Sequence, residues 1–135
     1  MSSQPIQRIL RHLTVRGYVV ETHVDDETEE EVYLADHPHR VGMFIRRVAG
    51  GLLFWSYFRH SERAQNDLNG FLLLVNKTNR DALVARFFVD ADYDLIFEAW
   101  HPDRYARDEF DLFLDAWQHD CMLCLSVEGL EEYLI

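Results

Sequence analysis

A β-hairpin is predicted most clearly by residues 41–58, which read VGMFIRRVAGGLLFWSYF. The first half of this stretch is typical of a strand, with Met43 and Ile45 on one face. Ala49-Gly50-Gly51 follows, and glycine supplies the positive φ that a tight turn requires. Leu52–Phe58 is almost continuously apolar and aromatic, which indicates a strand covered on both faces.

Outside the hairpin, apolar residues recur at helical spacing in several segments, and short β-branched or aromatic runs separate them. The first helix is expected to begin near Pro5, with Ser2 or Ser3 as its cap. The second is expected after the capping residue Ser61; it contains Gly70, which costs about 1 kcal/mol relative to alanine, so a close neighbour is expected there. The predicted elements are a helix near 5–16, strands at 18–24, 32–35, 41–48 and 52–58, a helix at 62–80, strands at 83–89 and 95–100, a helix carrying Phe110 to Cys124, and a last short helix within 126–135.

This order of elements, helix–strands–helix–two strands–helix, predicts an α+β fold. Strands joined by short turns pair in an antiparallel sheet, and the helices are expected to pack on one side of it. A chain of 135 residues fits a single domain, 1–135, with a core of its own.

The composition limits the class of protein. The chain has 24 acidic and 13 basic residues, a net charge of −11, which disfavours a nucleic-acid partner. Aromatic residues make up 13%, too many for a disordered chain, and no run approaches the roughly 18 apolar residues of a membrane span. The N-terminus is not typical of a secretory signal, and two cysteines form no disulfide framework. We therefore expect a cytoplasmic protein.

Charge is distributed unevenly along the chain. Residues 1–58 carry six arginines against eight acids, a net charge of −2, and residues 59–135 carry −9. Lys77 is the one lysine, so the basic residues reflect either a coding preference for arginine or its planar, bidentate pairing. The acids from Asp25 to Glu31 predict a solvated loop.

Cys121 and Cys124 form a CxxC sequence near the end of the last long helix. Together with His119 they could serve a thiol- or metal-dependent enzyme or sensor. A redox motif, however, needs a helix N-terminus, and a zinc site needs a fourth ligand. Because both cysteines fall on the apolar face of the helix, core packing is the favoured interpretation.

Three other polar positions are considered and set aside. The acids of the segment 90–94 suggest a calcium loop, but the glycine and glutamate that such a loop needs are missing, so a hairpin turn is predicted. Asp36, His37 and His39 are expected on a surface turn, and Glu98 is expected to face solvent. No metal site, cofactor site or convergent catalytic set is predicted, so the chain is not expected to be an enzyme.

The segment from Gly51 to Cys124 resembles the YbjN family, which is described as bacterial sensory transduction regulators. The resemblance lies in the aromatic strand at 53–58, in Asn76 and Asn79 at the end of the middle helix, and in the two strands that follow. It implies a fold similar to that of type III secretion chaperones, which are small, acidic and often dimeric.

Asn76 and Asn79 also have a physical interpretation. They lie three residues apart, on one face of the helix, where asparagine can bond nearby backbone groups. A structural role at the helix-to-strand turn is favoured over ligand binding, so Asn76→Ala is expected to lower thermal stability.

The sequence thus favours a non-enzymatic module that binds a protein or peptide partner. Its candidate binding or dimer surface is the strand face that carries Leu53, Trp55 and Tyr57, since an exposed apolar patch usually marks a partner. The resemblance implies a homodimer. The acids of the second half favour basic clients.

Overall fold

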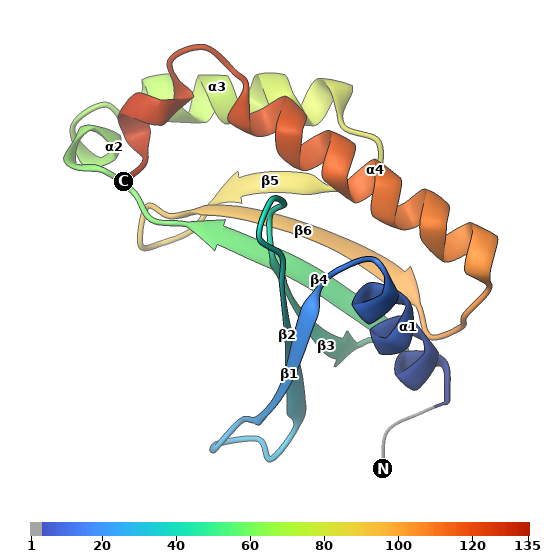
Figure 1. The fold of residues 1–135 in the computed structure, drawn as a ribbon. Helices are drawn as coiled ribbons and strands as arrows, with labels where there is room; N and C mark the ends of the chain where they lie inside the picture. The colour runs from blue at the N-terminus through green and yellow to red at the C-terminus, as the bar shows by residue number, and fades with distance from the viewer. Residues whose placement is uncertain (1–3) are drawn as a thin grey trace. The chain divides into compact units, whose positions relative to one another are not determined.

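The computed structural model describes residues 4–135, so the predicted caps Ser2 and Ser3 lie outside the described residues. Helices and strands follow one another in the predicted order (Figure 1). The elements are α1 (Gln4–Val15), β1 (Val19–Val24), β2 (Glu31–Asp36), β3 (Met43–Val48), β4 (Gly51–Phe58), α2 (Glu62–Asn66), α3 (Leu68–Asp81), β5 (Arg86–Val89), β6 (Leu95–Pro102), α4 (Arg107–Leu125) and the 3₁₀-helix η1 (Leu130–Tyr133).

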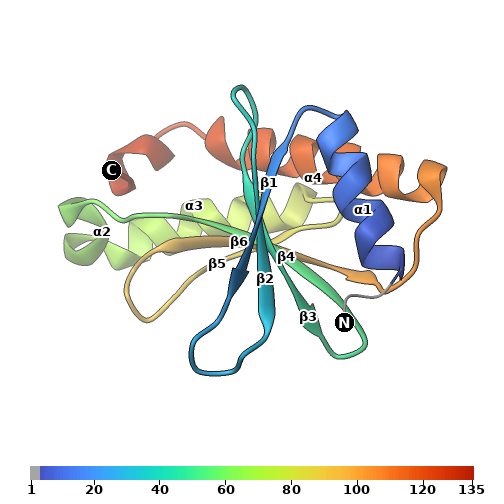
Figure 2. The same cartoon turned by 60° about the horizontal axis from the view of Figure 1, so that its bottom comes forward.

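The strands form one six-stranded sheet in the order β1-β2-β3-β4-β6-β5. The β1–β2, β2–β3, β3–β4 and β5–β6 pairs are antiparallel, and the long β1–β2 hairpin is clearest in Figure 2. The predicted α+β class with an antiparallel sheet is therefore confirmed. None of the helices in the described part of the chain is long and apolar enough to cross a membrane.

The contacts divide the chain into two compact units. The first unit comprises Met1–Trp55 with Trp100–Leu114, and the second comprises Ser56–Ala99 with Asp115–Ile135. The single-domain assignment stays a prediction.

In the first unit, helix α1 buries its apolar stripe of Ile6, Ile9 and Leu13. Met43 and Ile45 are also buried, which confirms that they share the inner face of β3. The prediction for β4 is wrong, because this strand alternates. Leu52 and Phe54 are fully buried, and the side chains between and after them are partly exposed. The remaining core residues of this unit are Tyr18, Tyr33, Ala35, Phe110, Phe113 and Leu114.

In the second unit, the predicted single helix at 62–80 is two helices. Asp67 leaves the helical conformation (φ −137°, ψ 62°), ends α2, and accepts a hydrogen bond from the Gly70 N–H as the N-cap of α3. Ser61 stands at the predicted cap position of α2, but its hydroxyl donates to the Glu132 carbonyl instead of the helix. The core of this unit contains Phe71, Val75, Phe87, Phe97, Trp117, Cys121, Cys124, Leu130 and Tyr133.

Candidate functional site

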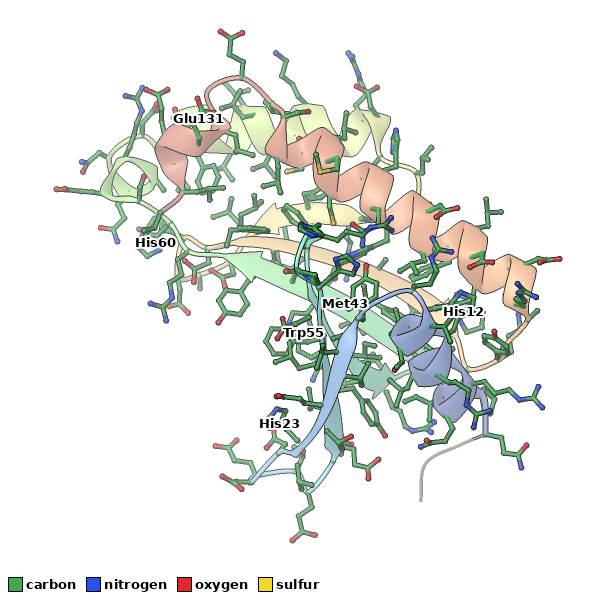
Figure 3. The ribbon with its side chains drawn as sticks, viewed as in Figure 1. His12, His23, Met43, Trp55, His60 and Glu131 are labelled. Atoms are coloured by element: carbon green, nitrogen blue, oxygen red, sulfur yellow. The ribbon has the colours of Figure 1, made fainter. Side chains whose placement is uncertain are left out.

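The partly exposed side of β3 and β4 in the first unit carries an aromatic surface. Phe44 and Trp55 face each other across the two strands, and their rings stack with centroids 5.2 Å apart. The guanidinium of Arg46 lies 5.5 Å from the centre of the Trp55 ring, and Leu53 is the cross-strand partner of Arg46. Leu34 continues the same row on β2. We call these five residues the outer aromatic face; Figure 3 labels Trp55 on it and Met43 on the inner face.

The turn between β3 and β4 fixes the register of this face. Ala49 (φ 52°) and Gly50 (φ 76°) both adopt positive φ, as a two-residue hairpin turn of matching twist requires. Val48 therefore pairs with Gly51, and Phe44 comes opposite Trp55. The predicted turn is confirmed.

The sequence-predicted surface residues Leu53 and Trp55 are half-buried on the outer aromatic face. Tyr57, the third residue of that prediction, belongs to the second unit and is 45% exposed. Whether these side chains bind a partner stays a prediction.

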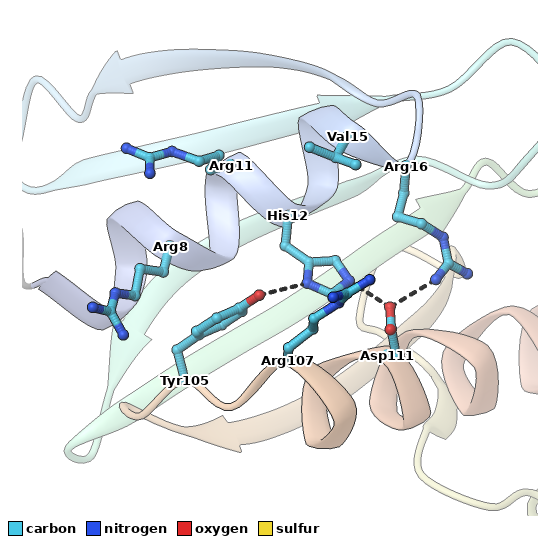
Figure 4. A pocket seen from close by; sticks show the side chains of 8 residues that line it. All are labelled: Arg8, Arg11, His12, Val15, Arg16, Tyr105, Arg107 and Asp111. Atoms are coloured by element: carbon cyan, nitrogen blue, oxygen red, sulfur yellow. Dashed lines mark hydrogen bonds and ion pairs between the residues drawn. The ribbon is translucent and has the colours of Figure 1, made fainter.

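A second feature of the first unit was not predicted from the sequence. A cleft of about 580 Å³ is lined by side chains of α1 and the residue after it, and by Tyr105 and the first turns of α4 (Figure 4). We call it the arginine cleft. Its lining residues are Arg8, Arg11, His12, Val15, Arg16, Tyr105, Arg107 and Asp111.

Four polar side chains in this cleft form one hydrogen-bonded chain, in the order Arg16, Asp111, His12 and Tyr105. The Asp111 Oδ1 atom lies 2.5 Å from His12 Nε2 and accepts a hydrogen bond from Arg16 at 2.7 Å. His12 Nδ1 lies 2.8 Å from the Tyr105 hydroxyl. In neutral His12, an Nε2–H that donates to the carboxylate leaves Nδ1 as the acceptor of the tyrosine proton.

The sequence contained one signal for this cleft. Arg8 and Arg11 lie three residues apart on α1, next to His12, and so share one helix surface. Their partners on the other side, Tyr105 and Asp111, are more than 90 residues away in the chain. No local pattern indicates that approach.

Asn76 and Asn79, the asparagine pair of the second unit, differ in their contacts. The Asn79 side chain donates to the Phe87 carbonyl at 2.7 Å and accepts from the Phe87 N–H at 2.8 Å. It thereby replaces a strand partner for β5, which is a structural role at the helix-to-strand turn. Asn76 is exposed on the same helix.

Because of these contacts, we expect the loss of stability for the Asn79→Ala variant and not for Asn76→Ala. Asn79→Ala should lower the free energy of unfolding by about 1–2 kcal/mol, because two backbone groups lose their partner. Asn76→Ala is the matched control and should change it by less than about 0.5 kcal/mol. Urea denaturation measures both, and equal losses for the two variants would contradict this division of roles.

Both cysteines of the CxxC sequence are free and buried. Burial, with the nearby Asp120 charge, raises the pKa of Cys121 well above its usual range, and burial raises the pKa of Cys124 to about 11. The His119 ring bonds Asp120 (3.0 Å). Within residues 4–135, no three His, Cys, Asp or Glu side chains are grouped to hold a metal ion. Both thiols lie in the core, and only a small fraction of either one would be ionised near neutral pH.

We expect this protection to be measurable. The native protein should react with a thiol reagent at pH 7 at least about a hundredfold more slowly than the protein unfolded in guanidinium, because exposed cysteine has a pKa of about 8.5. Native and unfolded rates within threefold of each other would contradict the core role.

The acidic turn at 90–94 is a hairpin turn, as predicted. Asp90 accepts hydrogen bonds from the N–H groups of Asp92 and Asp94, and Val89 pairs with Leu95. The His60 ring bonds Asp94 and lowers the pKa of that carboxyl.

The structure contradicts the prediction for Glu98 and places His39 on a surface turn, as expected. Glu98 was predicted to face solvent, and this is wrong. The side chain is only 8% exposed and is paired with Arg86, its cross-strand partner. His39 lies exposed on the surface turn after β2, and the neighbouring His37 ring packs edge-on against Tyr18 at 4.9 Å.

Asp120 is a buried charged residue whose role was not predicted from the sequence. Its carboxylate is fully buried and accepts hydrogen bonds from the backbone N–H groups of Leu83, Val84 and Ala85, at 2.8 to 3.1 Å. Burial raises the pKa of Asp120, but the backbone bonds outweigh it, so the pKa is lowered. The same bonds explain why β5 begins at Arg86 and not at Leu83.

These features define a class: an acidic α+β protein with a six-stranded antiparallel sheet, an outer aromatic face and an arginine-lined cleft. The family model described as "Putative bacterial sensory transduction regulator" matches residues 5–125. The chain therefore belongs to the YbjN family.

Comparison with solved structures gives the same fold. The crystal structure of YbjN from E. coli, described as "a putative transcription regulator", is similar with a TM-score of 0.65 and 14% sequence identity. The match covers 96% of this chain and 95% of that chain. Comparison with curated proteins gives no match.

Proposed function

We propose that this protein is a non-enzymatic regulator that holds an extended, basic and apolar segment of a partner protein on its outer aromatic face. The stacked Phe44–Trp55 pair carries the proposal, because aromatic rings left partly exposed on a sheet supply area for a partner. The proposal includes a cytoplasmic location, in keeping with two free, buried thiols.

Charge at the border of the outer aromatic face, beyond the Arg46 that already covers Trp55, favours a basic partner segment. Glu21 on β1 is in register with Leu34, which pairs with Phe44, which pairs with Trp55. Directly opposed residues point to the same side of a sheet, so the acidic side chain of Glu21 lies next to Leu34, at the edge of the outer aromatic face. The loop from Asp25 to Glu30 on the same hairpin is exposed and adds further negative charge. A basic side chain on the partner would complement this border.

The same charge argues against DNA as the partner. The E. coli structure carries the description "a putative transcription regulator", but the net charge of −11 on this chain repels a phosphate backbone. Regulation through a protein partner fits this chain better.

The experiment uses a labelled eight-residue peptide of alternating leucine and lysine as the probe, with fluorescence anisotropy of the full chain as the readout. Leu53→Asp should weaken binding at least about tenfold, because it places a charge among the aromatic rings. Leu112→Asp is the matched control, since Leu112 is 72% exposed on α4. It should leave the affinity unchanged within about twofold.

This design separates apolar docking from general attraction to an acidic protein. Both variants add a negative charge, so purely electrostatic binding would become tighter in both, and that result would overturn the proposal. Sedimentation tests a second copy as the occupant. A wild-type dimer that Leu53→Asp dissociates would show that this face is the homodimer interface and not a client site.

A further inference from the structure

We propose that the arginine cleft binds a small organic phosphate, whose negative charge is complemented by the arginines that line the cleft. The site is distinct from the outer aromatic face, because its lining comes from α1, the residue after it and the segment 105–111. It concentrates four arginines in a chain of net charge −11.

Among the arginines of the cleft, one forms an ion pair with a carboxylate of the described residues and three do not. The Asp111 carboxylate already accepts hydrogen bonds within the cleft, where it pairs with Arg16 and His12. Within residues 4–135, no carboxylate lies within ion-pair distance of Arg8, Arg11 or Arg107. Guanidinium groups that share a cleft repel each other, and a multiply charged anion removes that repulsion.

The chemistry of the donors favours phosphate. A guanidinium presents paired N–H groups in a planar fork that matches the oxygens of a phosphoryl group, and the pairing is charge-assisted. Lysine, which binds as a point charge, does not occur in this unit.

The floor of the cleft is preformed. The His12 side chain is only 7% exposed, and its ring packs edge-on against Phe110 at 5.0 Å and Tyr105 at 5.8 Å. Its hydrogen bonds to Tyr105 and Asp111 fix these two side chains, as Figure 4 shows. A rigid floor lowers the ordering cost of binding.

The size of the cleft indicates more than an inorganic ion. A volume of about 580 Å³ falls within the range of roughly 300–1,000 Å³ typical of small-molecule sites. The Tyr105 ring and the exposed Val15 side chain offer apolar surface for the organic part of such a ligand.

The test is isothermal titration calorimetry of the full chain at about 0.15 M salt, where the Debye length is near 8 Å. The probes are adenosine diphosphate, pyrophosphate, inorganic phosphate and a hexaglutamate peptide. Adenosine diphosphate and pyrophosphate should bind with micromolar dissociation constants, more tightly than inorganic phosphate or hexaglutamate.

Three variants locate the binding. The double variant Arg8→Gln with Arg107→Gln should weaken binding of adenosine diphosphate at least about tenfold, and Val15→Glu should weaken it too by adding a carboxylate at the rim. Arg40→Gln is the matched control, because Arg40 is exposed in the same unit and does not line the cleft. It should leave the affinity unchanged within about twofold.

Each contrary outcome overturns the proposal. If neither adenosine diphosphate nor pyrophosphate gives measurable heat, the cleft has no phosphate site. Tighter binding of hexaglutamate would assign the cleft to an acidic protein segment. Equal weakening by Arg40→Gln would show diffuse attraction without a site. The exposed positions of Arg8, Val15 and Arg107 leave the core intact, which thermal melting of the variants verifies.

Discussion

Asp120→Asn should lower the free energy of unfolding by about 3 kcal/mol, because hydrogen bonds to a buried charged group are worth about 1.5–3 kcal/mol each and cannot all be remade. In the native protein one carboxylate accepts from the N–H groups of Leu83, Val84 and Ala85. An asparagine has one acceptor oxygen, and its NH₂ group would face backbone donors. The chain before β5 would lose the group that holds it.

Guanidinium denaturation followed by circular dichroism measures the effect. Glu128→Gln is the matched control, because it removes the same charge at an exposed position of the same unit. The control should change the free energy of unfolding by less than about 0.5 kcal/mol. A loss of less than about 1 kcal/mol for Asp120→Asn would contradict the role assigned to these bonds.

The same carboxylate should make stability depend on pH. The pKa of Asp120 is lowered in the folded state, so its contribution is present above the unfolded value of about 3.9 and is lost as the pH falls through the folded pKa. The difference in stability between the wild type and Asp120→Asn should therefore be largest near pH 7 and shrink below about pH 4. A difference that stays constant from pH 7 to pH 3 would contradict this linkage.

Asp120 also shows where sequence reasoning stops. The placement of Cys121 and Cys124 on the apolar face of α4 was predicted correctly from helical spacing, and both side chains are buried. Asp120 breaks that pattern, and its donors lie about 35 residues earlier in the chain. A buried carboxylate is stable only through partners that the local sequence does not display.

The strands were predictable because their signals are local in the sequence, whereas the sites depend on contacts between distant parts of the chain. Alternation in β3, an apolar and aromatic run in β4 and the glycine turn between them identify the hairpin, because those signals are local. The continuous apolar run of β4 suggested cover on both faces, but Leu53 and Trp55 remain partly exposed. Cover depends on which helices pack against the sheet, and tertiary contacts decide that.

The arginine cleft illustrates the limit most directly. The preference for arginine over lysine in the whole chain was visible in the composition, yet the composition could not separate coding preference from function. What distinguishes the cleft is the approach of α1 to Tyr105 and Asp111, a contact over more than 90 residues.

Gly70→Ala should lower the free energy of unfolding by about 2 kcal/mol, although alanine is favoured over glycine by about 1 kcal/mol in an ordinary helix. A Cβ atom at position 70 would lie 2.5 Å from the Tyr133 hydroxyl and closer still to the Asp67 carboxylate. Both atoms are already fixed, since Tyr133 donates to Asp67 at 2.7 Å and Asp67 caps α3 through the Gly70 N–H at 3.1 Å. The close neighbour expected from the sequence is therefore present, and it is polar.

The sign of this effect is what makes the test informative. Asn69→Ala is the matched control, because Asn69 is exposed beside Gly70 in the first turn of α3 and reports helix preference alone; it should be neutral or slightly stabilising. Tyr133→Phe removes one of the two obstructing atoms, so Gly70→Ala should cost less in that background, by at least about 0.5 kcal/mol in a double-mutant cycle. A stabilising Gly70→Ala, or a cycle with no coupling, would show that α3 and η1 can separate without cost, and that the bond between Asp67 and Tyr133 does not fix the junction.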